Sequence, residues 1–123
     1  MQYQRSDRVA EQIRTEVSDI VLHELNDSSL GMITITRVTV SHDLRHAKIF
    51  YSVLGDETRQ KAGQEAMHRA LSHFRGEIGH RIRLRFVPEL SLHYDDSGAY
   101  ADRINLLLKE IQKQSPPDDT AIE

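Results

Sequence analysis

Positive charge that could neutralise phosphate is concentrated between residues 59 and 85. Seven Lys and Arg side chains fall in this stretch against two acidic ones, and three histidines lie among them. The whole chain of 123 residues has a net charge of −3, but local charge decides where a polyanion can bind. These residues are Arg59, Lys61, Arg69, Arg75, Arg81, Arg83 and Arg85, with His68, His73 and His80.

The sequence offers few residues that could act as a nucleophile or hold a metal ion. The absence of cysteine excludes a thiolate nucleophile, a disulfide and a Cys-ligated zinc site. His42 and His46 are four residues apart but flank a predicted turn, and the adjacent Asp95 and Asp96 point apart on an extended segment. No phosphate-binding loop or dinucleotide fingerprint is present. We therefore expect no catalytic residue, no metal and no cofactor, and a protein that is not an enzyme.

The elements that carry the cations are expected to form one α+β domain, because length and composition fit a single globular unit. A first helix is predicted to start at Ser6 or Asp7, either of which can cap it. Its apolar positions recur every three or four residues, as they do on the buried face of a helix. This stripe consists of Val9, Ile13, Val17, Ile20, Val21 and Leu25.

Two alternating segments after this helix predict a β-hairpin. In the first, Ile33 and Ile35 share one parity while Val38 and Val40 share the other, so we expect a bulge near residues 36–37. The second segment alternates in step and is expected to bury one face. The apolar residues of that face are Ala47, Ile49, Tyr51 and Val53.

A long helical stripe over residues 62–82 is followed by a predicted third strand. This strand is expected to turn Arg83 and Arg85 to one face as a short ladder suited to phosphates, with Phe86 on the other face. Pro88 cannot donate a ladder hydrogen bond, which places the strand at a sheet edge or gives it a bulge.

Several segments together resemble the ribosome-binding factor A family, over about residues 5–111. The most specific combination is Val-Ser-x-Asp-Leu at residues 40–44 with Pro-Glu-Leu at residues 88–90. The matching segments are Arg8 with Val9, and residues 34–44, 47–55, 83–90, 95–97 and 103–108.

This resemblance implies a KH-like type II domain of order α-β-β-α-α-β with a C-terminal helix, and a three-stranded sheet packed by helices on one face. It implies a bacterial, non-enzymatic assembly factor that binds the free or immature small ribosomal subunit and helps its 16S rRNA mature. Residues 1–113 would form the KH-like RNA-binding domain, with the last helix at 101–113. The polar, proline-rich and acidic residues 114–123 are expected to be a disordered tail.

The family resembles KH domains that have an Ala-x-Gly kink between two helices, which corresponds here to Ala70, Leu71 and Ser72. Serine stands where glycine is usual, and since serine is a good N-cap we expect a helix to start at His73. A literal Gly-x-x-Gly loop at residues 76–79 is disfavoured, because it leaves too few residues for a helix before the next strand.

The expected contact surface is a strip of small residues, Ser72, Gly76 and Gly79, flanked by cations that neutralise rRNA phosphates. The alternative is that the glycines relieve helix packing and the arginines are merely solvated. Charge reversal of Arg75, Arg81 and Arg83 is expected to leave folding intact. The predicted rRNA-binding residues are Arg69, His73, Arg75, His80, Arg81, Arg83 and Arg85, with secondary contacts from Arg5, Arg8, Arg45 and Lys48.

Aromatic side chains are expected to lie mostly in the core, so that recognition is mainly of RNA backbone and shape. These aromatic residues are Phe50, Tyr51, Phe74, Phe86 and Tyr94.

The implied partner is the small ribosomal subunit and its rRNA, bound by a monomer. The N-terminus lacks the apolar stretch of a signal peptide and no run approaches membrane-spanning length, so we expect a cytoplasmic protein without a membrane partner. The alternative is a KH-like module for protein–protein contact without direct RNA binding, docked through its apolar last helix. Binding of phosphates weakens steeply with salt whereas an apolar interface hardly responds, which separates the two.

Overall fold

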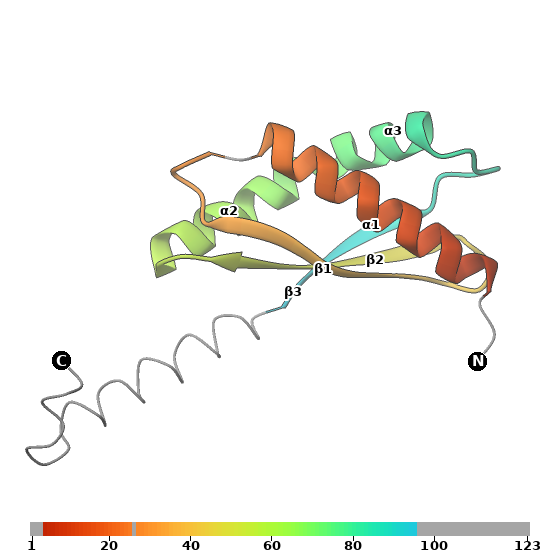
Figure 1. Cartoon of the computed structure of the whole chain (residues 1–123), viewed down its shortest axis with the longest axis horizontal. Helices are drawn as coiled ribbons and strands as arrows, with labels where there is room; N and C mark the ends of the chain where they lie inside the picture. Colours follow the sequence, from red (N-terminus) through yellow and green to blue (C-terminus); the bar gives the residue numbers. More distant parts are fainter. Residues whose placement is uncertain (1–3, 26, 96–123) are drawn as a thin grey trace, which may run out of the picture.

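The computed structural model describes residues 4–25 and 27–95, in which helices and strands follow the predicted order (Figure 1). The α+β class and the order α-β-β-α-α-β are therefore confirmed. The predicted last helix and acidic tail, residues 101–123, lie outside the described residues. The elements are α1 (Arg5–Glu24), β1 (Met32–Val40), β2 (His46–Leu54), α2 (Glu57–Arg69), α3 (Leu71–Arg81) and β3 (Glu89–Tyr94).

The three strands form one sheet in the order β1-β2-β3, with β2 in the centre. β1 and β2 form the predicted antiparallel hairpin, and β3 lies parallel to β2 at a sheet edge, one of the two predicted arrangements, although Pro88 precedes the strand instead of lying within it. The register shifts between Ile35 and Arg37, where the change of apolar parity predicted a bulge. This extra residue lets both halves of β1 turn their apolar side chains to the same face.

All three helices cover one face of the sheet, and the core lies between these two layers (Figure 1). The predicted stripe of α1 is buried from Val9 to Val21, and the predicted inner face of β2 is buried along its length. Phe74 and Ile78 of α3 are completely buried against them. Burial of this apolar surface is the main force that holds helices and sheet together.

The start of α1 differs from the prediction. Gln4 is the N-cap, and the backbone N–H of Gln4 donates to the carboxylate of Asp7 at 3.0 Å. Asp7 therefore closes the first turn from within the helix, as the acidic member of a capping box does. Ser6 is instead a buried residue of that turn.

The two helices α2 and α3 meet at Ala70, within the predicted kink. Ala70 has φ −86° and ψ −3°, and its N–H donates to the carbonyl oxygens of both Ala66 and Met67. Ser72 itself lies within α3 and has no positive φ, so this break needs no glycine at position 72. The expected start at His73 is wrong: α3 begins at Leu71, and Ser72 lies in its first turn. α3 also runs through residues 76–79, so no Gly-x-x-Gly loop forms.

The predicted arginine ladder on the third strand is wrong. β3 begins only at Glu89, and residues 83–88 form an irregular connection, so Arg83 and Arg85 lie on no strand. The reason lies in the partner strand: β2 begins at His46, which pairs with Glu89, and the chain before His46 turns away. Residues before Pro88 therefore have no strand to pair with, and Phe86 is 67% exposed rather than in the core.

Two glycines of the helices give opposite predictions for stability. A Cβ at Gly63 would lie 2.8 Å from Cγ1 of the buried Val53, whereas a Cβ at Gly76 would meet nothing within 4 Å. Since valine is stiff and this part of the core is packed, we expect Gly63→Ala to destabilise the fold by about 1–3 kcal/mol. Gly76→Ala removes only the flexibility of glycine in a helix, which stabilises the fold by roughly 0.5–1 kcal/mol.

Chemical denaturation of both variants, followed by circular dichroism, measures the two free energies of unfolding. Equal effects of the same sign would contradict the packing of α2 on β2 described above.

Candidate nucleic-acid interface

The rotation of α3 about its own axis decides where each predicted contact residue points. Phe74 and Ile78, four residues apart, are fully buried and fix this rotation. A helix has 3.6 residues per turn, so the side chains on either side of this buried stripe fall on two separate flanks. One flank faces α1, and the other faces the start of β2 and the connection to β3.

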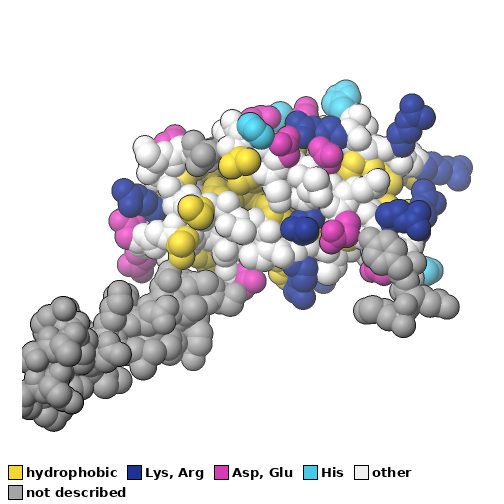
Figure 2. All heavy atoms as spheres, in the orientation of Figure 1, with side chains coloured by type: hydrophobic (Ala, Val, Ile, Leu, Met, Phe, Trp, Pro, Cys, Tyr) yellow, Lys and Arg dark blue, Asp and Glu magenta, His cyan; other side chains and the backbone are white. Residues whose placement is uncertain are grey.

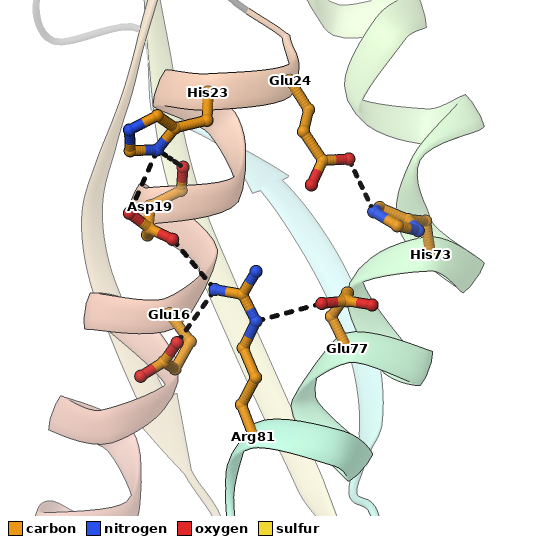
Figure 3. Close-up of polar contacts among 7 residues, drawn as sticks. All are labelled: Glu16, Asp19, His23, Glu24, His73, Glu77 and Arg81. Atoms are coloured by element: carbon orange, nitrogen blue, oxygen red, sulfur yellow. Dashed lines mark hydrogen bonds and ion pairs between the residues drawn. The ribbon is translucent and has the colours of Figure 1, made fainter.

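The flank that faces α1 carries a network of ion pairs (Figure 3). The guanidinium of Arg81 donates to Glu16, Asp19 and Glu77, each at 3.0 Å. Hydrogen bonds to Glu16, then to Asp19 and Glu77, hold the pKa of Arg81 above its ordinary value. The positive charge of Arg81 is thus neutralised by three carboxylates of the same protein.

His73 also belongs to this flank, because its Nε2 lies 2.8 Å from a carboxylate oxygen of Glu24 on α1 (Figure 3). The structure thus directs two of the predicted rRNA-binding residues, His73 and Arg81, toward acidic side chains of α1. Both side chains tie α3 to α1. These contacts replace the expectation that charge reversal at Arg81 leaves folding intact: a glutamate there would face three other carboxylates, so we now expect it to destabilise the fold.

The other flank borders a groove between α3, the start of β2 and the connection to β3. Its main hollow, of about 850 Å³, is joined to a smaller one through Ser72, Arg75 and Val87, which line both. We call the two hollows together the α3 groove. Its polar and small lining residues are Arg45, His46, His68, Ser72, Arg75, Gly76, Gly79, His80 and Glu89.

The two glycines of the groove have different roles. A Cβ at Gly79 would lie 3.0 Å from Val87, so glycine there lets the connection to β3 pack closely on α3. Gly76 faces open space. Relief of packing therefore accounts for Gly79 but not for Gly76, which leaves the helix backbone accessible at the groove.

The charge of the groove is mainly positive. Within residues 4–25 and 27–95, no carboxylate lies within ion-pair distance of the side chains of Arg45 or Arg75. The one carboxylate that lines the groove, Glu89, lies 3.8 Å from His46. Two arginines that form no ion pair with a described residue, beside accessible helix backbone, suit a phosphate chain.

Arg45 is held in place by the turn between β1 and β2. Leu44 has φ 64°, a left-handed conformation that costs a non-glycine residue roughly 1 kcal/mol or more. The carboxylate of Asp43 accepts hydrogen bonds from the Ser41 hydroxyl at 2.7 Å and from the Arg45 N–H at 3.1 Å. The Ser41 hydroxyl, followed by the Arg45 N–H, holds the pKa of Asp43 below its ordinary value.

The remaining predicted contacts are distributed around this groove. Arg5 and Arg85 line a neighbouring hollow together with Arg45, while Arg8, Arg69, Arg83 and Lys48 are exposed and line neither that hollow nor the α3 groove. Lys and Arg side chains gather at the end of the molecule where α1 begins and α3 ends (Figure 2).

Sequence reasoning missed some lining residues and underrated another. His46 and His68 were not among the predicted contacts, and Phe86 was assigned to the core. Arg45 was predicted only as a secondary contact, although it lines both the groove and the neighbouring hollow. No local pattern shows that residue 45 lies beside α3, because the parallel pairing of β2 with β3 creates that proximity.

Residues 4–25 and 27–95 contain no group of three or more His, Asp or Glu side chains that could hold a metal ion. None of the helices there is long and apolar enough to cross a membrane.

Comparison with known proteins gives a consistent result. The family model for ribosome-binding factor A matches residues 5–108. Proteins named ribosome-binding factor A from Halothermothrix orenii and Geobacter metallireducens are each 42% identical to this chain. The first alignment covers 96% of this chain and 97% of the relative, and the second covers 95% and 99%.

Solved structures with this fold include the crystal structure of ribosome-binding factor A from Thermus thermophilus. Its TM-score is 0.61 at 19% identity, over 72% of this chain and 94% of that one. A homology model of the Thermus thermophilus protein, fitted into a cryo-electron microscopy map of its complex with 30S, has a TM-score of 0.60 at 20% identity. That match covers 71% of this chain and 91% of the other.

The two flanks of α3 predict opposite effects of charge reversal on folding. Arg81→Glu replaces the cation among Glu16, Asp19 and Glu77 with a fourth carboxylate, so we expect the melting temperature to fall by several degrees. Added salt should recover part of this loss, because it screens repulsion between exposed charges. Arg75→Glu, on the groove flank, is the matched control and leaves the melting temperature nearly unchanged. Thermal melts that coincide for the two variants would contradict the assignment of the flanks.

Proposed function

The chain belongs to the ribosome-binding factor A family, and from this premise we propose that it is an assembly factor of the small ribosomal subunit. It binds the free or immature subunit as a monomer in the cytoplasm and assists the maturation of 16S rRNA. It acts by binding rather than by catalysis. The complex between the Thermus thermophilus relative and 30S supports this choice of partner.

The observation that carries the proposal is the α3 groove. Arg45 and Arg75, which form no ion pair with a described residue, line it, and the backbone at Gly76 is open beside Arg75. A phosphate chain supplies the charge that these arginines lack, and a strand of backbone fits beside a helix without side-chain bulk. Binding through this groove reads mainly the backbone and shape of rRNA.

Within this proposal the predicted contact residues divide into two groups. Arg75, His80 and Arg45 contact rRNA at the groove, and Arg5 and Arg85 extend the contact to the adjoining hollow. Arg8, Arg69, Arg83 and Lys48 add charge around it. His73 and Arg81 act as positioning residues, since their contacts with α1 hold α3 in the orientation that opens the groove.

The assisting step follows from where the positive charge lies. A folded rRNA segment held along the groove gives up counterions and loses its freedom to rearrange, so the protein stabilises one assembly conformation over others. Release before translation needs a change in the subunit that removes this segment from the groove.

A second candidate function rests on exposed apolar side chains at another site. Leu22 and Met32, 62% and 68% exposed, line a hollow between the end of α1 and the start of β1. Such a surface can dock another protein without RNA. The alternative derived from the sequence placed that docking on the last helix, which lies outside the described residues.

Cosedimentation with free small subunits at low and high salt separates the two functions. We expect binding to small subunits that weakens steeply with salt, with a log–log slope that falls by about one for each phosphate contact removed. Arg45→Glu and Arg75→Glu should each reduce affinity at least severalfold. Gly76→Ala, expected to stabilise the free protein, should weaken binding because its methyl group occupies the groove.

Arg14→Glu, a reversal on the exposed side of α1, is the matched control and should bind normally. Binding that is insensitive to salt and to the groove variants, but is lost in Met32→Ala, would favour the protein-docking function instead.

A further inference from the structure

Phe86 is an exposed aromatic ring that the fold does not use. Burial of a phenylalanine side chain contributes about 1.5–3 kcal/mol, yet 67% of Phe86 is left in water. It follows α3 on the irregular connection and lines two hollows, both of which also include Arg45. This exposed ring therefore lies next to the α3 groove, because Arg45 lines both the groove and the two hollows that the ring lines.

The connection that carries the ring is fixed to its neighbours in the fold. The N–H of Glu89 donates to the carbonyl oxygen of Arg45 at 2.8 Å, which joins the connection to the turn between β1 and β2. Pro88 is fully buried, and Leu84 packs against the core. The turn itself is closed by Asp43 and the left-handed Leu44. The ring and Arg45 are thus attached to two segments that are hydrogen-bonded to each other.

Three arginines line one hollow with the ring, so its setting is polar and positive. Arg5, Arg45 and Arg85 line the hollow with Phe86, and the Arg85 guanidinium lies 5.6 Å from the ring centroid. The one acidic residue of this hollow, Asp43, accepts hydrogen bonds from Ser41 and the backbone of Arg45. A ligand that fits has a flat apolar face and carries negative charge beside it.

We propose that Phe86 is a stacking platform for one unpaired nucleobase of small-subunit rRNA, with Arg5 and Arg45 binding the phosphates on either side of it. The inference rests on the proposed function and names a second mode of contact for the same surface. A base within a duplex has both faces covered, so the ligand is a nucleotide in a loop, bulge or single-stranded segment. Every base offers such a face, so the stack adds affinity with little sequence preference.

A base stacked on Phe86 gives the RNA contact a local geometry that the groove alone lacks. The groove binds backbone along α3, and the ring at its end takes a base that leaves the stack. An apolar protein side chain is the competing occupant, but it brings no negative charge to the three arginines of this hollow, where Asp43 is the one acidic residue.

Three substitutions at residue 86 distinguish the two occupants in binding to free small subunits. Phe86→Ala and Phe86→Leu should each weaken binding by about tenfold, the size of one base–aromatic stack, while Phe86→Tyr, which keeps a ring, should bind like the unmutated protein. Met32→Ala, which truncates a similarly exposed apolar side chain elsewhere, is the control and should bind normally. Because residue 86 is exposed, these variants are expected to fold.

Ultraviolet crosslinking of the complex, followed by mass spectrometry, gives an independent readout. A nucleotide attached to Phe86 is the expected result. Normal binding by Phe86→Leu would overturn the stack in favour of an apolar protein contact, and normal binding by Phe86→Ala would show that the ring contributes nothing. In both cases salt-sensitive binding through Arg45 and Arg75 would leave the proposed function standing. Failure of the unmutated protein to bind subunits would overturn the function and the stack together.

Discussion

The rest of the surface depends on the burial of Phe74 and Ile78, which fixes how α3 is turned. Two fully buried side chains one helical turn apart leave the helix a single orientation on the sheet. Everything else on α3 follows from its place relative to that stripe. Side chains on one side meet the acidic residues of α1, and those on the other border a groove whose far wall is the start of β2. The hydrophobic core therefore determines which cations remain available to a ligand.

Cations of the same type consequently have different roles on one short helix. Arg81 has its charge offset by three carboxylates, whereas Arg75, on the groove flank, has no acidic partner in the described part of the chain. The first is part of how the fold is held and the second is available for phosphate. A net charge of −3 is compatible with this division, because the ion pairs of α1 place acidic residues away from the groove.

Much of the fold could be predicted because each element has a strong local pattern. The stripe of α1, the parity of β2 and the phase change that marks the bulge in β1 are periodic features of the sequence. The contacts of Arg81 and His73 could not be predicted, because both flanks of α3 carry basic side chains. The sequence does not show which flank packs against α1. The connection before β3 resembles a strand in the sequence because Leu84 and Phe86 alternate, but the strand β2 that would pair with it begins only at His46, opposite Glu89. Local pattern thus specifies elements, and tertiary pairing specifies which cations and which ring meet.

Hydroxyl-radical footprinting of side chains, on the free protein and on its complex with small subunits, tests most directly whether RNA occupies the α3 groove. The account predicts protection of His68, His80 and Phe86, which line the groove or the hollows beside it. Leu22 and Met32, which line the hollow at α1 and β1, should react equally in both states. Protection of Leu22 and Met32 with unchanged reactivity of His68, His80 and Phe86 would contradict the account.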